Sequence, residues 1–328
     1  MLPRQRTDLP LGRLQHSLPK ISFVVTNAFP NSLLRIFSLL LVLFLCLGSQ
    51  SLGAQKDVRD PDQPPRDSTP PVRLYKTKPL IELPLTAVGF YFSQEQIKAF
   101  RNKPRFPEED LPTLEDNDVP GIDRIALRQD PAKAEDFAKI SDIFFITGQL
   151  APFTLFAWKK YRDEWLDITT MYLEAQALQG LFYGYAPFGP NSSDRLRPRS
   201  YYQEIDIFER TNGNAQASLF SGHVSTTATG WYFYAKIITD HNPDLTGGQK
   251  ALVYGAASLP GIATAVLRVK ALKHFPTDTF IGMGVGAISG ILVPEFHRWW
   301  QKRFRTKAMV TPVYGDGGAA GLGFNLRF

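Results

Sequence analysis

The sequence predicts an all-α protein: a bundle of five to six helices, preceded by short β-like segments and followed by a C-terminal β-hairpin. Apolar residues recur at helical spacing between residues 120 and 304. Small residues are frequent in the last of these segments, where they permit close contact between helices. Residues 305–328 change to the shorter repeat that is typical of paired strands.

Residues 1–54 have the features of a signal peptide or membrane anchor. Arg35 precedes an apolar run from Ile36 to Leu47, and small residues ending at Ala54 follow. The run has the length of a signal-peptide core and is short for a bilayer span. We therefore expect an exported protein of the cell envelope. Two placements stay open, an inner-membrane protein with its site facing the periplasm and a protein free in the periplasm.

Charge and cysteine content exclude two classes of protein. Of the formal charge of +6, the leader of residues 1–54 supplies +4. The remaining +2 is too small to indicate a protein that binds nucleic acid. The single cysteine, Cys46, lies in the apolar run of the leader. We therefore expect a fold that needs no disulfide.

Residues 55–119 are expected to form a spacer and an irregular region. The segment up to Arg73 is charged and rich in proline, which favours an extended chain. From Leu74 to Phe92 the apolar residues are of β type, but Pro79 and Pro84 interrupt them. We expect short strand-like segments there, because proline is confined to the edges of sheets.

Residues 120–304 are expected to form the helical domain. The predicted helices are Ala132–Trp158 with a break near Gly148–Pro152, Trp165 to about Tyr185, Val224–Thr239, Gln249 to about Leu267, and Thr277–Trp300. The small residues expected to allow close packing are Gly282, Gly284, Gly286, Ala287 and Gly290. None of these helices is a charge-free run of about twenty residues, so a membrane-embedded bundle and a soluble bundle both remain open.

The tail of residues 305–328 is predicted to be a hairpin that turns around Gly315–Gly318. A strand that ends in Phe328 resembles the closing strand of an outer-membrane barrel. One hairpin closes no barrel, so a hairpin packed on the bundle is favoured, with association with an outer membrane as the alternative.

Two segments bring histidine to a predicted helix start. In the first, Arg268 is followed by His274 and then by Asp278, with Pro276 at a position suited to the first turn of a helix. A helix start offers unpaired amides and partial positive charge, which suits a phosphate. A histidine held by a carboxylate there can act as a nucleophile. A surface histidine beside a helix start is the alternative interpretation.

The second segment is Phe220-Ser221-Gly222-His223. Ser221 is a good helix cap, and Gly222 permits close approach of a ligand to the backbone. Upstream, three arginines, Arg195, Arg197 and Arg199, lie within five residues of one loop. Such a cluster can hold phosphate oxygens bidentately, or it can simply face solvent or lipid headgroups.

The order Arg-Pro, Ser-Gly-His and Arg-x5-His-x3-Asp resembles the three-part signature of the type 2 phosphatidic acid phosphatase superfamily. That superfamily includes lipid phosphate phosphatases, class A acid phosphatases and vanadium-dependent haloperoxidases. The resemblance covers roughly residues 120 to 300, and it implies a phosphatase/haloperoxidase-type helical core.

The resemblance also implies roles for the matching residues. His274 would attack phosphorus and become phosphohistidine, Asp278 would orient and polarise it, and His223 would protonate the leaving oxygen. The implied phosphate-binding residues are Arg197, Arg268, Ser221 and the amide of Gly222, with Arg195 as an added contact. No metal and no cofactor are implied.

Three positions depart from the superfamily pattern. Pro190 stands where the first motif begins with lysine, so either Arg195 or Arg199 replaces that charge or the lysine contact is lost. Phe220 replaces a proline of the second motif, and Leu267 replaces a serine of the third motif.

The sequence and the resemblance thus predict a metal-independent phosphatase that hydrolyses a phosphomonoester or a diphosphate through a phosphohistidine, with a lipid as the favoured substrate. The expected partners are a phosphorylated lipid or small phosphate ester and a membrane, and no nucleic acid. The alternatives are an acid phosphatase for soluble esters, a vanadate-dependent haloperoxidase and a non-catalytic binder of lipid phosphate.

Overall fold

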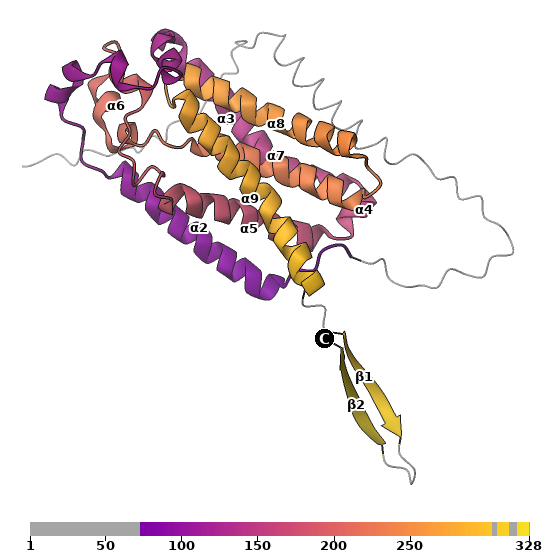
Figure 1. Ribbon diagram of the computed structural model, residues 1–328. Coiled ribbons are helices and arrows are strands. Elements are labelled where there is room, and N and C mark those ends of the chain that lie inside the picture. Colours follow the sequence, from indigo (N-terminus) through magenta and orange to yellow (C-terminus); the bar gives the residue numbers. More distant parts are fainter. Residues whose placement is uncertain (1–72, 304–306, 315–319, 328) are drawn as a thin grey trace, which may run out of the picture. The chain divides into compact units, whose positions relative to one another are not determined.

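The computed structural model describes residues 73–303, 307–314 and 320–327, and helices are the regular secondary structure of residues 73–303. This confirms the all-α prediction. The long helices are α2 (Pro79–Arg101), α3 (Ala134–Leu150), α5 (Trp165–Tyr185), α7 (Gly222–His241), α8 (Gly247–Lys270) and α9 (Pro276–Arg303) (Figure 1). The short α-helices are α4 (Lys159–Arg162) and α6 (Ile207–Thr211).

Short 3₁₀-helices fill most of the connections. They are η1 (Glu108–Thr113), η2 (Asp116–Asp118), η3 (Asp123–Arg128), η4 (Pro131–Lys133), η5 (Ala151–Ala157), η6 (Pro198–Tyr201) and η7 (Gly213–Gln216). The five helices predicted from apolar spacing are all present, and α5 has the predicted bounds. The break expected near Gly148–Pro152 is the change from α3 to η5.

The prediction of strand-like segments between Leu74 and Phe92 is wrong for residues 79 to 92, because these residues belong to α2. Pro79 is the first residue of the helix, where its missing N–H costs nothing. Residues with small side chains on one face of α2, among them Gly89 and Ser93, lie against α5, while larger apolar residues point outward. This tertiary contact outweighs the β propensity of the apolar residues.

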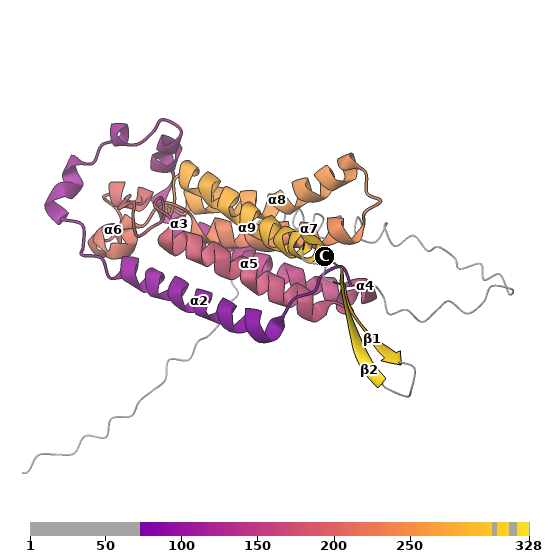
Figure 2. The ribbon, with the colours of Figure 1, turned by 60° about the horizontal axis from the view of Figure 1, so that its bottom comes forward.

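Helix α7 runs through the centre of the bundle and packs against α3, α5, α8 and α9 (Figure 1). Helices α2 and α5 lie side by side and parallel, because Gly89 faces Ala177 and Gly184 faces Gln96 (Figure 2). The long helices alternate in direction along the chain. Consequently α3, α7 and α9 begin at the end of the bundle where α2, α5 and α8 finish.

Three glycines of α9 allow it to approach α7 at backbone distance. A Cβ atom on Gly282 would lie 2.6 Å from the Ser221 carbonyl oxygen, and a Cβ atom on Gly290 would lie 2.5 Å from that of Thr229. Gly286 is confined in the same way, whereas Gly284 has open space around it. The expected close packing is therefore confirmed for the glycines on one face of α9.

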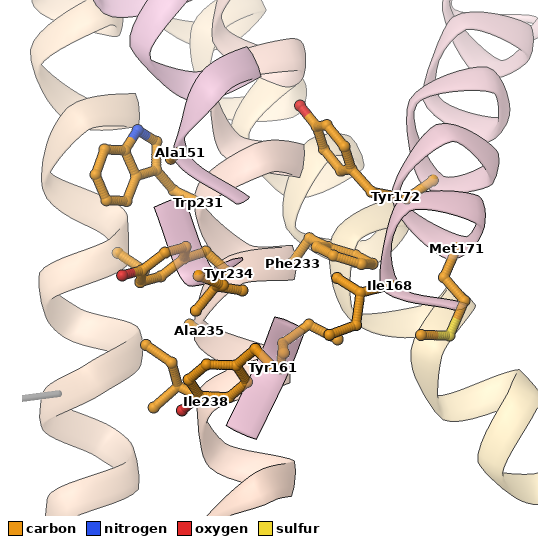
Figure 3. Close-up of a cluster of buried hydrophobic side chains, with 14 of the residues drawn as sticks. Ala151, Tyr161, Ile168, Met171, Tyr172, Trp231, Phe233, Tyr234, Ala235 and Ile238 are labelled. Carbon is orange, nitrogen blue, oxygen red and sulfur yellow. The ribbon is translucent and has the colours of Figure 1, made fainter. Parts of the chain in front are cut away.

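The main apolar core occupies the half of α7 that is remote from its N-terminus (Figure 3). Phe233 of α7 packs against the ring of Tyr172 of α5 at 5.2 Å between centroids, and Ile168 and Met171 are fully buried beside them. This core fixes the central helix at one end. The other end of α7 is left to polar residues.

The chain enters and leaves the helical bundle at the same end. Tyr75 is fully buried, and its hydroxyl donates to Asp240 at the end of α7. Near the end of α9, the Gln301 side chain donates to the carbonyl of Lys76. The segment before α2 and the last turns of α9 therefore lie together.

Strands β1 (Lys307–Tyr314) and β2 (Ala320–Arg327) pair antiparallel, with Lys307 opposite Arg327 and Tyr314 opposite Ala320. This confirms the predicted hairpin. The predicted leader of residues 1–54 and most of the spacer lie outside the described residues.

Three helical stretches are long and apolar enough to cross a membrane: Pro131–Ala157, Gly247–Lys270 and Pro276–Arg303. They contain α3, α8 and α9. Their outward faces carry exposed apolar side chains, for example Ile146, Ile262 and Phe280.

Candidate active site

The two predicted histidine segments meet where α7 and α9 begin. Helix α7 starts after Ser221, whose backbone N–H donates to the carbonyl of Asp278 at 3.0 Å. Arg268 lies in the last turn of α8, directly before the turn that leads to His274. Segments that are about fifty residues apart in sequence thus form one end of the bundle.

The ring of His274 is held in one tautomer by a backbone carbonyl. Its Nδ1 lies 2.7 Å from the carbonyl oxygen of Ser218, which can only accept, so Nδ1 carries the proton. The side chain is 2% exposed, and burial together with the charges of Arg197 and Arg268 lowers the pKa of His274 well below its usual range. The neutral ring therefore keeps a lone pair on Nε2, as a nucleophile requires.

Asp278 lies close to His274 but contacts it indirectly. Its carboxylate accepts from Ser218 Oγ at 2.6 Å, from the Phe275 backbone N–H at 2.9 Å and from Arg195 at 2.6 Å. The sequence-based expectation was that Asp278 orients His274 directly. In the structure Ser218 lies between them, with its hydroxyl on Asp278 and its carbonyl on the His274 ring.

The guanidinium of Arg195 is occupied by two buried carboxylates. One terminal nitrogen contacts Asp278 and the other contacts Asp123, each at 2.6 Å. The plane also lies 4.5 Å from the centre of the Phe275 ring. Arg195 was predicted to bind phosphate, but both of its terminal nitrogens are used in these contacts with the carboxylates. Its observed role is to join η3 and the start of α9.

Arg197 and Arg268 are buried, at 5% and 6% exposure, and each has unused donor capacity. Arg197 uses one terminal nitrogen on Asn214 and the carbonyl of Ala217, and Arg268 uses one on Ser141. The Nε atoms of both arginines have no hydrogen-bond partner among residues 73–303, and the same holds for Ser221 Oγ. Buried donors without partners are costly, which makes this a site for an anion.

Gly222 and His223 form the exposed side of the site. A Cβ atom on Gly222 would lie 3.1 Å from ring atoms of Tyr183, so a side chain there would be crowded. His223 Nε2 lies 3.1 Å from Asp142 Oδ1, and its ring lies 4.6 Å from that of Phe145. Burial and the charge of Arg268 lower the pKa of His223 to about 4, while Asp142 opposes this shift.

A second group of possible metal ligands lies away from this site. Glu82, Glu174 and His297 bring their ligand atoms within 4.8 Å of one another. His297 Nε2 already contacts Glu174 Oε2 at 2.7 Å, which satisfies the pair as a hydrogen-bonded contact. The arginine, histidine and serine donors beside His274 are instead suited to bind an anion.

Residues 167–302 match the family model of the PAP2 superfamily, and they contain every predicted site residue. This match supports membership of the chain in the PAP2 superfamily. No curated protein and no solved structure was found that matches the chain. Membership in this superfamily, that of the type 2 phosphatidic acid phosphatases, supports phosphatase- or haloperoxidase-type phosphoryl chemistry at the level of the family.

Three residues beside the PAP2 motifs were missed by sequence reasoning. Asp142 comes from α3, outside the matched region, and only its position in the fold brings it to His223. Ser218 acts through its backbone carbonyl as well as its hydroxyl, and a backbone contact leaves no side-chain pattern. Lys273 stands directly before His274, so its nearness to the motif was the one available signal.

The position of the absent motif lysine is held by other contacts. The carbonyl of Pro190 accepts from Lys103 Nζ at 2.9 Å, and Lys103 also pairs with Asp194. Lys103 is therefore bound by the loop that contains Pro190 and Asp194. The Arg199 backbone N–H donates to the carbonyl of Leu272 at 3.2 Å, which ties the arginine loop to the turn before Lys273.

Lys273 is placed by the turn that ends α8. Leu272 has a φ of +55°, and the amides of Leu272 and Lys273 donate back to the carbonyls of Val269 and Arg268. This is the pattern of a Schellman motif. Burial and the charges of Arg199, Arg197 and Arg268 lower the pKa of Lys273 to about 8. A lysine thus faces the same arginines as His274.

Proposed function

We propose that this PAP2 domain hydrolyses a phosphate ester or diphosphate of a lipid through a phosphohistidine on His274. The unpartnered Nε atoms of Arg197 and Arg268 beside a neutral, buried imidazole support this proposal most strongly. A phosphoryl group bound there would satisfy the free donors, and the same charges would stabilise the transition state.

In the first step, Nε2 of His274 attacks phosphorus, and the bond from phosphorus to the ester oxygen breaks. Protonated His223 donates to the leaving oxygen, while its Nε2 stays on Asp142 and its Nδ1 supplies the proton. A bound phosphate dianion would raise the pKa of His223 from about 4, because the negative charge favours the imidazolium.

In the second step, a water molecule gives a proton to His223 and attacks phosphorus. The N–P bond then breaks, which releases phosphate and returns His274 to its neutral form. Ser218 keeps the ring in the required tautomer throughout both steps, because its carbonyl accepts from Nδ1.

A lipid substrate is supported by the apolar surface of the bundle. The stretches that contain α3, α8 and α9 are long and apolar enough to cross a bilayer, and the site lies at the end of the bundle where α3 and α9 begin and α8 finishes. This arrangement would place the phosphate near the headgroups of one leaflet. The hydrocarbon chain of the lipid would enter the bundle from the side.

The mechanism is tested with purified His274→Ala and His223→Ala variants. His274→Ala should lower phosphate release by ~10³-fold or more, because no nucleophile remains. His223→Ala should lower it by ~10²–10⁴-fold for alkyl esters, whose leaving group needs a proton. His297→Ala, a histidine outside the site, is the matched control and should keep full activity.

The intermediate can be observed directly. With 4-nitrophenyl phosphate, whose leaving group needs little protonation, His223→Ala should accumulate phosphate on the peptide that contains His274. Mass spectrometry of the quenched enzyme measures this. Full activity of His274→Ala, or phosphate on another residue, would refute the proposed mechanism. Assays with phosphatidate, a polyprenyl diphosphate and a soluble ester then decide the substrate class.

A further inference from the structure

A cavity of about 510 Å³ extends from the exposed side of the site into the bundle. It begins at Gly222 and His223 and is walled by α2, α3 and α5. Its volume is within the range of about 300–1,000 Å³ that is usual for small-molecule sites, and it far exceeds the space that one phosphate needs. His274, Arg197 and Arg268 lie outside its lining, so the cavity has a task other than holding the phosphoryl group.

The side walls of the cavity are mainly apolar. From α2 they include Phe90, Ile97 and Phe100, and from α3 and η5 they include Phe145 and Phe153. These side chains suit a hydrocarbon, because each Å² of apolar surface that is buried stabilises the complex by roughly 25 cal/mol.

Two glutamines that line the cavity, Gln176 and Gln179, already have hydrogen-bond partners. Gln179 donates to Ser225 Oγ at 2.5 Å and accepts from Thr226, and Gln176 donates to the Tyr172 hydroxyl at 2.8 Å. A hydrocarbon lying on them would therefore not leave buried donors without partners.

The cavity is elongated along two parallel helices. Its lining follows α5 from Tyr183, beside the site, to Tyr172, and follows α2 from Arg101 to Phe90. At about 1.5 Å of rise per residue, each of these stretches spans about 16 Å. The cavity is thus long enough for an extended chain whose polar end lies at His223.

Exposed apolar residues occur at the cavity and on the helices that wall it. Leu150 lines the cavity and is 58% exposed, and Val88 and Phe92 of α2 and Ile146 of α3 are exposed on the same helices. Such exposed apolar surface matches the acyl region of a bilayer and not bulk water.

We propose that this cavity is the subsite for one extended hydrocarbon chain of the phosphate ester, with α2 as the wall that selects for the chain. The proposal rests on the function proposed above, because the phosphate end is placed at His223. Helix α2 precedes the region that matches the PAP2 family model, so selection for the chain would be a feature that this protein adds to the catalytic domain.

The first test compares hexadecyl phosphate with 4-nitrophenyl phosphate. Leu173→Trp on α5 and Ile97→Trp on α2 each fill the cavity, and each should lower kcat/KM for hexadecyl phosphate by about tenfold or more, the effect usual for a blocked apolar subsite. Both should leave 4-nitrophenyl phosphate hydrolysis within about twofold, because that ester lacks a chain. Leu166→Trp, an exposed position on α5, is the matched control. Equal losses for both esters, or no loss for either, would overturn the proposal.

The second test does not depend on catalysis. Hexadecylphosphonate with a photoreactive diazirine at the end of its chain is bound to the full-length protein in detergent micelles and irradiated. Cross-links should map to Phe90, Leu173 or Phe153, and Leu173→Trp should abolish them. Cross-links confined to the outward face of α8 would overturn the subsite. Cross-links in the cavity without any phosphate release would keep the subsite and refute the phosphatase.

Discussion

The carbonyl of Ser218 accepts a hydrogen bond of 2.7 Å from Nδ1 of His274, and this contact fixes which ring nitrogen can attack. The hydroxyl of Ser218 is bound to Asp278, which is bound in turn to Arg195. The nucleophile is therefore positioned through the main chain, and the buried carboxylate supports that main chain.

Asp278→Ala should destabilise the protein by about 3–5 kcal/mol, because it leaves the partly buried guanidinium of Arg195 with one carboxylate fewer. Thermal unfolding in detergent measures this. Asp278→Asn keeps one acceptor oxygen, which can accept from both Ser218 Oγ and the Phe275 N–H, and it should be less destabilising. If Asp278 instead acted only by polarising His274, both variants would lose activity without a change in melting temperature.

Asp142→Asn should lower kcat/KM and move the alkaline limb of its pH profile to lower pH. The negative charge of Asp142 stabilises protonated His223, so its removal lowers the pKa of His223 further. Less of the acid is then protonated at any given pH. Asp136→Asn, at an exposed position of the same helix, is the control and should leave the profile in place.

We assign Lys273 as a further phosphate contact, because the charges of Arg197 and Arg268 act on it as they do on His274. Lys273→Met should then raise KM for an anionic ester by about tenfold, since a hydrogen bond to a charged group contributes about 1.5–3 kcal/mol. In the wild type, KM should rise above pH 8, because Lys273 has a pKa of about 8 and loses its charge there. Lys273→Met should lack this rise, and Lys273→Arg should retain a low KM to higher pH. The neighbouring Lys270→Met tests for a general effect of charge, and a KM equal to that of Lys273→Met would contradict the assignment.

Gly286→Ala should destabilise the bundle by about 1–3 kcal/mol, because the added methyl meets the backbone of α7 at Ser225. Gly284→Ala is on the same helix with open space around it and should stabilise by roughly 0.5–1 kcal/mol through helix propensity. Melting temperatures of the two variants in the same detergent provide the comparison. Equal shifts would show that α7 and α9 are not in backbone contact.

The helices were predictable to the extent that their apolar residues face a core. Helix α5 was bounded correctly because charged and aromatic residues mark its ends. Helix α2 was missed because its small residues face inward and its large apolar residues face outward, which reverses the usual pattern. The spacing of the large apolar residues therefore marks the exposed face of α2 and not the face toward the core.

The site was predictable where motifs are local. His274, Asp278 and Arg268 are close in sequence and close in space. Arg195 could not be separated from Arg197 because both belong to one loop, and only the partner Asp123 shows that Arg195 is engaged. The contact between Asp142 and His223 joins residues 81 positions apart, so no local pattern contained it.

Because the long helices alternate in direction, the first and last residues of the bundle lie at the same end of it. Gln301 contacts Lys76 there, whereas His274 lies at the opposite end. A reporter fused at Arg73 or at Arg303 would therefore be attached at the end of the bundle opposite His274. Anything joined to the protein at these points, such as a tether or an affinity tag, would leave the face on which phosphate is released unobstructed.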